Sequence, residues 1–352
     1  MNSKRFIRLS LCLTLILLIL VAGVQIAVDP LFQYHTPWFG MKPVIINDRY
    51  QNAGVAKNFD FDNVIIGNSL SENYKVSDVS NAFGGETVKL TASGSHALDW
   101  TYILSILNKK DSAPKHILIN MDPYIFNASP TELKHELPEY LYDRDYFNDV
   151  KYLYNFSVIK DFTYDAIKRN KNNRIPNYDS FMLWSDDFEY GKDFVLSHYN
   201  RPKVSTETLY SDDTEDYCNN IDQNLSLLFP FIEGMSDTEF VFFFSPFSML
   251  FWDMEMRENG VEKQKAGYLK ACEILSAYDN VSLYLWTDND MLDVMGDLNN
   301  YCDEAHYSPK VCEMMAERIG KKEGIIIRET YKEEINKLFD YIENYDYEKL
   351  FV

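Results

Sequence analysis

The N-terminal part of the chain contains a run of twenty residues, 9–28, without a charged side chain. A helix of that length covers the hydrocarbon core of a bilayer. Three basic residues lie within residues 1–8, and Asp29 follows the run. Because basic flanks stay in the cytosol, the run predicts a single-pass signal anchor in the cell membrane, with residues 1–8 cytosolic and the main domain extracytoplasmic. A cleaved signal peptide is the alternative, although Gln25 and Val28 stand where cleavage sites need small residues.

The acidic excess of the chain narrows the classes of partner. Its 34 Lys and Arg face 54 Asp and Glu, for a formal net charge of −20. Nucleic-acid binding requires basic patches that neutralise phosphate, so we expect no nucleic-acid partner. The sequence holds neither a G-x-G-x-x-G nor a P-loop motif. We therefore expect no cofactor.

Four of the five cysteines follow the apolar run and would face an oxidising compartment, where pairing is permitted. Their spacing does not choose among the three possible pairings. No C-x-x-C pair occurs, which argues against a zinc site. These four cysteines are Cys218, Cys272, Cys302 and Cys312.

Short apolar runs alternate with helical patterns along the rest of the chain, which predicts an α/β fold with a largely parallel sheet. Runs rich in β-branched and aromatic residues are typical of strands buried on both faces. We expect such strands at 63–67, 86–93, 116–122, 239–245 and 281–286. The main helices are expected at 96–109, 261–278 and 309–319.

The organisation of the exported part follows from these elements. We expect one main domain, 29–325, and an acidic C-terminal helix, 326–352, which packs on the body or reaches a partner. The segment 127–237 separates the third and fourth strands and is too long for a simple crossover. It is interpreted as a helical insertion that borders a site, with a surface subdomain as the alternative.

Two short blocks carry the candidate chemistry. Ser69 directly follows the first strand, and its amide lies near the start of the next helix, where it could stabilise an oxyanion. Far downstream, Asp303 and His306 are three residues apart, just before the last core helix. A carboxylate at this spacing can orient the imidazole while the far ring nitrogen faces a hydroxyl. Two metal ligands are the alternative interpretation of that pair, but we expect no metal, because no third ligand is grouped with it.

The order of these blocks resembles the SGNH/GDSL hydrolase superfamily. The GNSL stretch, 67–70, is similar to the nucleophile block, with Asn68 in place of the usual Asp, and 303–306 is similar to the D-x-x-H block. The TASGSH stretch, 91–96, resembles the second block, which implies an oxyanion amide at Gly94. The resemblance implies a three-layer αβα sandwich, flavodoxin-like, with a mostly parallel five-stranded sheet. It also implies Ser69 as nucleophile, His306 as base and Asp303 as its acidic partner.

The third block departs from the superfamily pattern. Asp122, in INMDPYIF, stands near the place of the usual G-x-N-D, and a carboxylate does not donate to an oxyanion unless it is protonated. This departure, with the anchor, is similar to membrane-anchored members such as the D-alanine transfer protein of teichoic acid synthesis and the alginate O-acetylation proteins. That resemblance implies a membrane-bound O-acyltransferase as partner. It also implies a cell-surface glycan or teichoic-acid-like polymer as acceptor.

Three functions are therefore open. The first is serine-dependent O-acylation of a cell-envelope polysaccharide; the second is a carbohydrate esterase that uses water as acceptor; the third is a non-catalytic binding scaffold. Four further residues near the expected sheet edge are candidate substrate contacts, namely Asn68, His96, Asp122 and Ser248.

Overall fold

The computed structural model describes residues 3–181, 183, 188–204 and 214–352. Two compact units make up the chain. Met1–Phe59 and Leu137–Asn177 form the first, and Asp60–Glu136 and Tyr178–Val352 form the second. The expected insertion, 127–237, thus contributes to both units.

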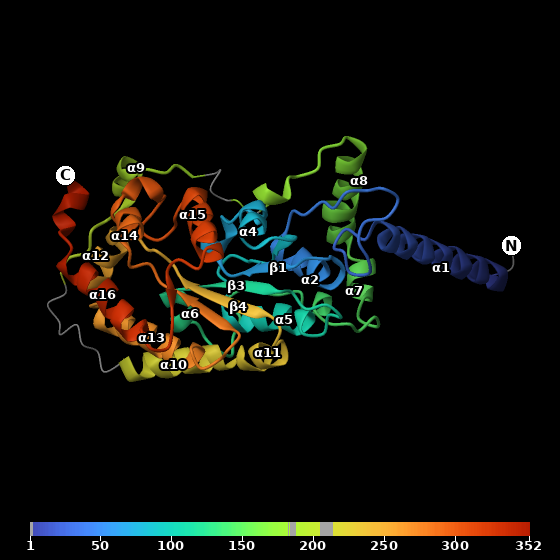
Figure 1. The fold of residues 1–352 in the computed structure, drawn as a ribbon. Helices are drawn as coiled ribbons and strands as arrows, with labels where there is room; N and C mark the ends of the chain where they lie inside the picture. Colours follow the sequence, from blue (N-terminus) through green and yellow to red (C-terminus); the bar gives the residue numbers. More distant parts are fainter. Residues whose placement is uncertain (1–2, 182, 184–187, 205–213) are drawn as a thin grey trace. The chain divides into compact units, whose positions relative to one another are not determined.

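The first unit begins with helix α1 (Ser3–Val28), which contains the whole apolar run (Figure 1). Among the described residues, α1 is the one helix with the length and composition to cross a membrane. All side chains from Leu11 to Leu20 on this helix are exposed. An N-terminal helix of spanning length is therefore present, and its orientation across a membrane stays a prediction.

In the rest of the first unit, several groups bind Asp29, the residue that follows the apolar run. Its buried carboxylate accepts hydrogen bonds from the amides of Gln33, Tyr34 and His35 and from the Tyr152 hydroxyl. These bonds fold the chain back after α1. The helical elements that follow are α2 (Asp48–Asn58), η1 (Glu139–Leu141), α7 (Val150–Leu153), η2 (Val158–Thr163) and α8 (Tyr164–Lys171).

The second unit is built on a six-stranded sheet of order β2-β1-β3-β4-β5-β6. The first five strands are parallel, and β1, β3 and β4 are buried except for the first residue of β3 and of β4, as their apolar sequences predict. Their bounds are β1 (Asn63–Ile66), β2 (Thr87–Lys89), β3 (His116–Met121), β4 (Glu239–Phe244) and β5 (Val281–Tyr284).

The expectation of five strands is wrong by one. Strand β6 (Ile325–Ile326) pairs antiparallel with β5, which makes the sheet mixed. Gly324 precedes β6 with φ of +79°, and its carbonyl accepts a hydrogen bond from the Leu285 amide. Two residues are too few to show strand alternation, so the sequence pattern could not reveal this strand.

Helices cover both faces of the sheet, in three layers (Figure 1). On one face α4 (Val76–Phe83) packs on α15 (Pro309–Gly320), and a Cβ at Gly320 would lie 2.8 Å from the Ala82 carbonyl oxygen. The other face carries α5 (Ala97–Leu107), α10 (Thr214–Ser226), α13 (Glu262–Leu275) and α16 (Tyr331–Asn344). The apolar stripe of α16 is buried, so this acidic C-terminal helix packs on the body.

The second unit contains further, mostly short, helical segments. They are α3 (Ser69–Glu72), α6 (Pro123–Asn127), η3 (Tyr178–Ser180), α9 (Lys192–His198), α11 (Phe229–Gly234), α12 (Met249–Glu258), α14 (Asn289–Gly296), η5 (Leu298–Asn300) and η6 (Tyr347–Phe351).

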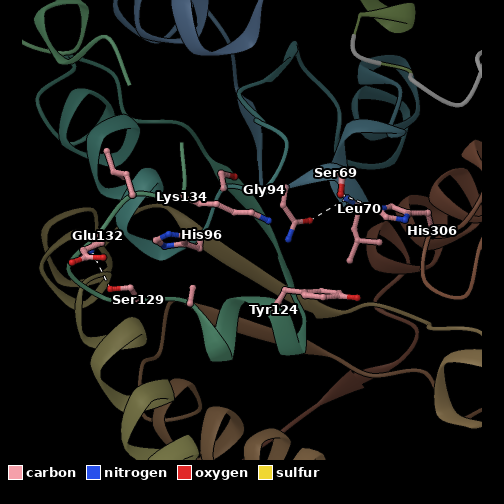
Figure 2. Close-up of a pocket in the computed structure, with 13 residues that line it drawn as sticks. Ser69, Leu70, Gly94, His96, Tyr124, Ser129, Glu132, Lys134 and His306 are labelled. Atoms are coloured by element: carbon pink, nitrogen blue, oxygen red, sulfur yellow. Dashed lines mark hydrogen bonds between the residues drawn. The ribbon is translucent and has the colours of Figure 1, made fainter. Parts of the chain in front are cut away.

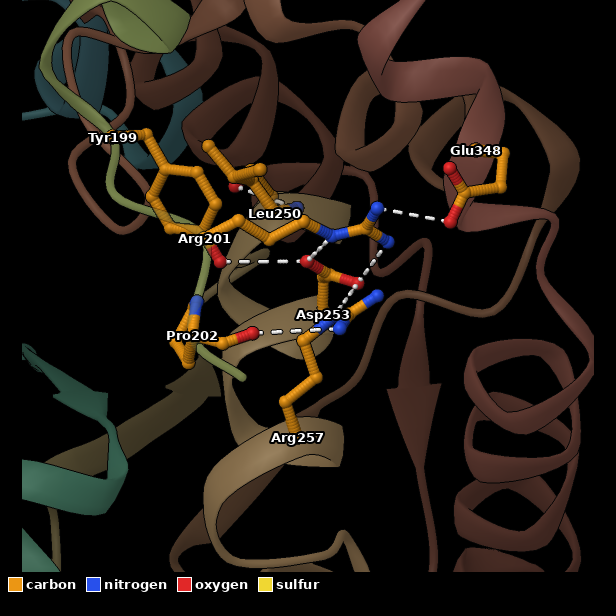
Figure 3. Close-up of polar contacts among 8 residues, drawn as sticks. Tyr199, Arg201, Pro202, Leu250, Asp253, Arg257 and Glu348 are labelled. Atoms are coloured by element: carbon orange, nitrogen blue, oxygen red, sulfur yellow. Dashed lines mark hydrogen bonds and ion pairs between the residues drawn. The ribbon is translucent and has the colours of Figure 1, made fainter. Parts of the chain in front are cut away.

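A buried carboxylate fixes α12 to two distant parts of the chain (Figure 3). Asp253 accepts two hydrogen bonds of 2.8 Å from the guanidinium of Arg201 and one of 3.1 Å from Arg257. Arg201 also donates to Glu348 in the C-terminal η6. Bidentate pairs of this kind fix geometry as well as charge. This network ties α12, whose N-cap residue is Ser248, to the segment around Arg201 and to η6.

All five cysteines are free thiols, and Cys272, Cys302 and Cys312 are buried. Burial raises the pKa of the Cys302 thiol to about 12, with the charge of Asp303 adding to the effect. These thiols therefore pack as small apolar side chains.

Candidate active site

Ser69 lies at the carboxyl end of β1, where it begins the short helix α3. Asn68 caps this helix, because its side-chain oxygen accepts a hydrogen bond from the Leu70 amide at 3.0 Å. Gly67 makes the turn possible through lack of a side chain rather than through a left-handed backbone. A Cβ there would lie 2.2 Å from Asn120 Oδ1 and 2.4 Å from Ser71 Oγ.

The structure brings Ser69 together with His306 and Asp303, although Ser69 and His306 are 237 residues apart in the sequence. Ser69 Oγ lies 2.9 Å from His306 Nε2, and His306 Nδ1 lies 2.7 Å from Asp303 Oδ2. A carboxylate only accepts, so Nδ1 carries the proton and Nε2 is left to accept from the serine hydroxyl. This is the relay by which a serine is made nucleophilic.

A tight loop holds the acid and base in this geometry. The other carboxylate oxygen, Asp303 Oδ1, accepts from the amides of Ala305 and His306 at 2.8 and 2.6 Å. Tyr301 and Tyr307 close the loop through an isolated antiparallel bridge. The backbone amides of Ala305 and His306 thus fix the position of the Asp303 carboxylate.

The segment after β4 is joined to the same loop by two hydrogen bonds, which we call the clamp. Ser248, the N-cap of α12, donates from its hydroxyl to the Glu304 carbonyl at 2.6 Å. The Tyr301 hydroxyl donates to the Pro246 carbonyl, also at 2.6 Å. Ser248 is completely buried. The sequence placed it among the substrate contacts; the structure places it instead under the loop, because the hydroxyl is needed for the cap and the clamp.

The electrostatics of the pair favour a charged imidazolium beside an ionised carboxylate. Burial lowers the pKa of His306, but the hydrogen bond and charge of Asp303 outweigh it, and Glu304 and Asp122 add to the rise. The net pKa of His306 is therefore raised. Burial raises the pKa of Asp303, yet the hydrogen bond and charge of His306 and two loop amides leave it lowered. Asp303 is thus positioned to stabilise the charge that His306 gains when it takes a proton.

Asp122 is also placed differently from the expectation that it contacts substrate. It is fully buried and caps α6, where Oδ1 accepts from the amides of Tyr124 and Ile125. Oδ2 accepts from the side-chain amides of Asn68 and Asn120, both at 2.8 Å. Burial raises the pKa of Asp122, and these four donors oppose that rise. Because every bond points into the protein, Asp122 orients Asn68 rather than a ligand.

A cavity of about 550 Å³ opens in front of Ser69 and His306 (Figure 2). Asn68, Gly94 and His96 line it, together with the first residues of the expected insertion. In Figure 2 the Lys134 side chain extends between Ser69 and His306 on one side and His96 and Glu132 on the other. The complete lining is Asn68, Ser69, Leu70, Gly94, Ser95, His96, Tyr124, Ala128, Ser129, Glu132, Leu133, Lys134 and His306.

Gly94, the predicted oxyanion residue, lines the cavity with a left-handed backbone at φ of +66°. A Cβ there would be 3.0 Å from His135 Nε2 and 3.4 Å from Lys134 Cδ, so a side chain would meet the wall of the insertion. The turn is fixed by Ser95, whose hydroxyl donates to the Gly67 carbonyl at 2.8 Å. Ser95 thereby ties the Gly94 turn to the Ser69 turn.

His96 has two roles in the structure. It is the N-cap residue of α5, and its amide donates to Asp99 at 3.1 Å. It also lines the cavity. His96 therefore lines the cavity, while its backbone amide contributes to the start of α5.

Sequence reasoning missed three residues that shape the site. Asn120 lies inside buried β3 and accepts a hydrogen bond from Ser71 at 2.7 Å. A polar residue within an apolar strand run was the available signal. Lys134 and Tyr124 line the cavity from segments with no periodic pattern. Burial, with the charges of Glu304, Asp122 and Asp303, raises the pKa of Tyr124 to about 12, so its hydroxyl keeps its proton.

Comparisons with known proteins add little to this geometry. No protein-family model matches the chain, and no curated protein sequence matches it. Eight chains of solved structures match. One, from Streptococcus pneumonia, is described as a proposed platelet activating factor; it shares 13% identity over 84% of this chain and 90% of its own, with a TM-score of 0.36. A similarity this low carries no argument about activity.

Proposed function

We propose that the protein is an extracytoplasmic serine enzyme that transfers an acyl group to a hydroxyl of a cell-envelope polysaccharide. One observation carries the proposal, namely the unbroken relay Ser69–His306–Asp303 at the cavity. The relay places a hydroxyl, its base and the partner of that base within hydrogen-bond distance. This arrangement serves acyl transfer through a covalent intermediate.

In the first half of the proposed reaction Ser69 Oγ attacks the carbonyl carbon of an acyl donor while His306 Nε2 takes the hydroxyl proton. The negative charge on the carbonyl oxygen is stabilised by the amides of Ser69 and Gly94. The tetrahedral intermediate collapses, the donor leaves with the proton from His306, and an acyl ester remains on Ser69. Asp303 stabilises the imidazolium in the intervening state.

In the second half the acceptor hydroxyl attacks the acyl ester, with His306 again as base, and Ser69 is released with its proton. The Lys134 ammonium forms no ion pair or hydrogen bond within the described part of the chain, and its side chain extends into the cavity. A free cation there suits a substrate that carries anionic groups, which the net charge of −20 would otherwise repel.

Hydrolysis is the second candidate function, in which water is the acceptor. The Asp303 and His306 side chains are 42% and 29% exposed, so water has access to the relay. A membrane-bound O-acyltransferase as donor partner is part of the first proposal. Its support is the resemblance in sequence and the spanning helix α1.

A fluorophosphonate probe tests the shared chemistry, because it reacts only with an activated serine. Full-length protein in detergent should label stoichiometrically, and Ser69→Ala and His306→Ala should not. Ser129→Ala is the matched control, since Ser129 lines the same cavity without a histidine partner in the structure. Labelling that survives Ser69→Ala would overturn the proposal.

Transfer and hydrolysis are then separated with an acyl ester substrate and an added polysaccharide. Acylated polysaccharide as the main product would support transfer. Release of free acid at the same rate with and without polysaccharide would support hydrolysis.

A further inference from the structure

Exposed apolar side chains are concentrated in the first compact unit, which does not contain the relay residues. Outside α1, nine large exposed hydrophobic side chains of the described chain belong to this unit and six to the larger second unit. Five of the nine lie within eleven residues, 146–156, which we call the aromatic segment. They are Tyr146, Phe147, Val150, Tyr154 and Phe156.

The exposure of these side chains ranges from 38% at Tyr154 upward. Phe147 is 95% exposed and Phe156 is 75% exposed. Phe147 lies in the turn before α7, Val150 begins α7 and Tyr154 is its C-cap residue, so these exposed side chains lie on and beside one short helix. Soluble surfaces rarely present such clustered aromatic side chains to water, and a cluster of this kind marks an interaction surface.

The opposite side of the aromatic segment is anchored to the end of α1. Tyr152 is buried, and its hydroxyl donates to Asp29 at 2.7 Å. Asp149 accepts a hydrogen bond of 2.9 Å from the Tyr34 hydroxyl. These two polar side chains therefore face inward, whereas the exposed apolar side chains of the segment lie on the outer surface.

The aromatic segment also contacts α1 within the apolar run itself. The Tyr154 hydroxyl donates to the Leu18 carbonyl at 3.2 Å, and Thr163 in η2 donates to the buried side chain of Gln25. Leu18 lies ten residues before Val28, about 15 Å along the helix. A span that reaches Val28 therefore places the Tyr154 hydroxyl about half-way through the hydrocarbon core, which is about 30 Å thick, so the segment lies along the outer-leaflet half of the span.

We propose that the aromatic segment is a second membrane contact, which immerses its exposed side chains in the outer leaflet beside α1. The occupant of the surface is phospholipid, because the surface is continuous with the lipid-facing side of the spanning helix. Phenylalanine and valine side chains suit contact with acyl chains, and the Tyr154 hydroxyl, which would be costly to leave unpaired in lipid, is satisfied by the Leu18 carbonyl. The inference rests on the membrane anchor of the proposed function.

Spin labels in lipid nanodiscs test this inference. The full-length chain carries Cys12→Ser and Cys218→Ser, because these two thiols are the ones that are not buried. Single cysteines are then introduced as Phe147→Cys or Phe156→Cys, both at exposed positions where no packing is lost. Nanodiscs of phosphatidylethanolamine and phosphatidylglycerol contain no partner protein.

Collision of the label with oxygen, which enters lipid, is compared with collision with a water-soluble nickel chelate. We expect labels at both positions to favour oxygen. A label at Leu17→Cys, on the exposed face of α1, is the lipid reference, and one at Ile327→Cys, an exposed apolar position of the second unit, is the water reference.

Nickel accessibility at 147 and 156 equal to that at 327, with the label at 17 in lipid, would overturn the membrane contact but leave the anchor intact. The surface would then be free for a protein partner. Nickel accessibility at 17 as well would overturn the anchor and the inference together. Fluorophosphonate labelling of Ser69 reports on the enzyme proposal independently of both outcomes.

Discussion

The Asp303 carboxylate provides the sharpest test of the relay, through the substitution Asp303→Asn. One oxygen of the asparagine can still accept from the Ala305 and His306 amides, which lie 2.8 and 2.6 Å from Asp303 Oδ1. The loop should therefore keep its conformation. The second oxygen becomes an amide nitrogen 2.7 Å from His306 Nδ1, and it can only donate.

Two consequences follow at His306. The ring must accept at Nδ1, which places its proton on Nε2, where it faces Ser69 Oγ and prevents base catalysis. The equivalent change in a serine protease, a worked example of the same relay, lowers turnover about 10⁴-fold, and we expect a loss of roughly 10³–10⁴-fold here. The pKa of His306 should also fall, because the hydrogen bond and charge of Asp303 are what raise it.

The assay is the second-order rate constant of fluorophosphonate labelling, measured across pH. Glu304→Gln is the matched control, since Glu304 raises the pKa of His306 by its charge without a bond to the ring. It should slow labelling only a few-fold, as expected of a partly exposed charge. A loss in Asp303→Asn no larger than that in Glu304→Gln, with both variants folded, would refute the relay.

Three further predictions concern pH and the supports of the site. Labelling of the wild type should rise with pH around a midpoint above 6.5, because His306 acts only when neutral and its pKa is raised; a midpoint below 6.5 would contradict the assignment. The stability that the raised pKa of His306 contributes should be lost as the pH rises through the folded pKa, whereas the contribution of the lowered pKa of Asp303 should be lost as the pH falls through its own folded pKa. Gly67→Ala should lower the free energy of unfolding by about 1–3 kcal/mol in denaturant titrations, because its Cβ would meet Asn120 and Ser71, whereas Gly296→Ala, whose nearest contact would be 3.3 Å away, should not. Ser248→Ala should cost about 1–2 kcal/mol through the lost cap and clamp and should slow labelling as the loop loosens; unchanged labelling would show that the clamp does not position His306.

Local patterns determined much of the fold. The apolar run was sufficient to predict α1, because a spanning helix needs about twenty uncharged residues in succession. The parallel strands β1, β3 and β4 are buried on both faces along most of their length and therefore appear as apolar runs, and each of the five parallel strands was predicted within a few residues of its observed bounds. The spacing of Asp303 and His306 predicted their contact, since three residues of chain fix that distance.

Other features were decided by tertiary structure. Asp122 and Ser248 were recognised as polar residues at the sheet edge, but only packing shows that their bonds point inward to Asn68 and to the Glu304 carbonyl. Strand β6 forms by pairing with the exposed edge of β5. The two residues of β6 are too few to show a strand pattern in the sequence.

The relay shows the same division between sequence and structure. The sequence by itself determined which residues could be nucleophile, base and acid, because their chemistry belongs to the side chains. The 2.9 Å between Ser69 and His306, which are 237 residues apart, depends on β1 and the loop before α15 ending at one edge of the sheet. Such a distance is set by how parallel strands and helices pack, and no local pattern encodes it.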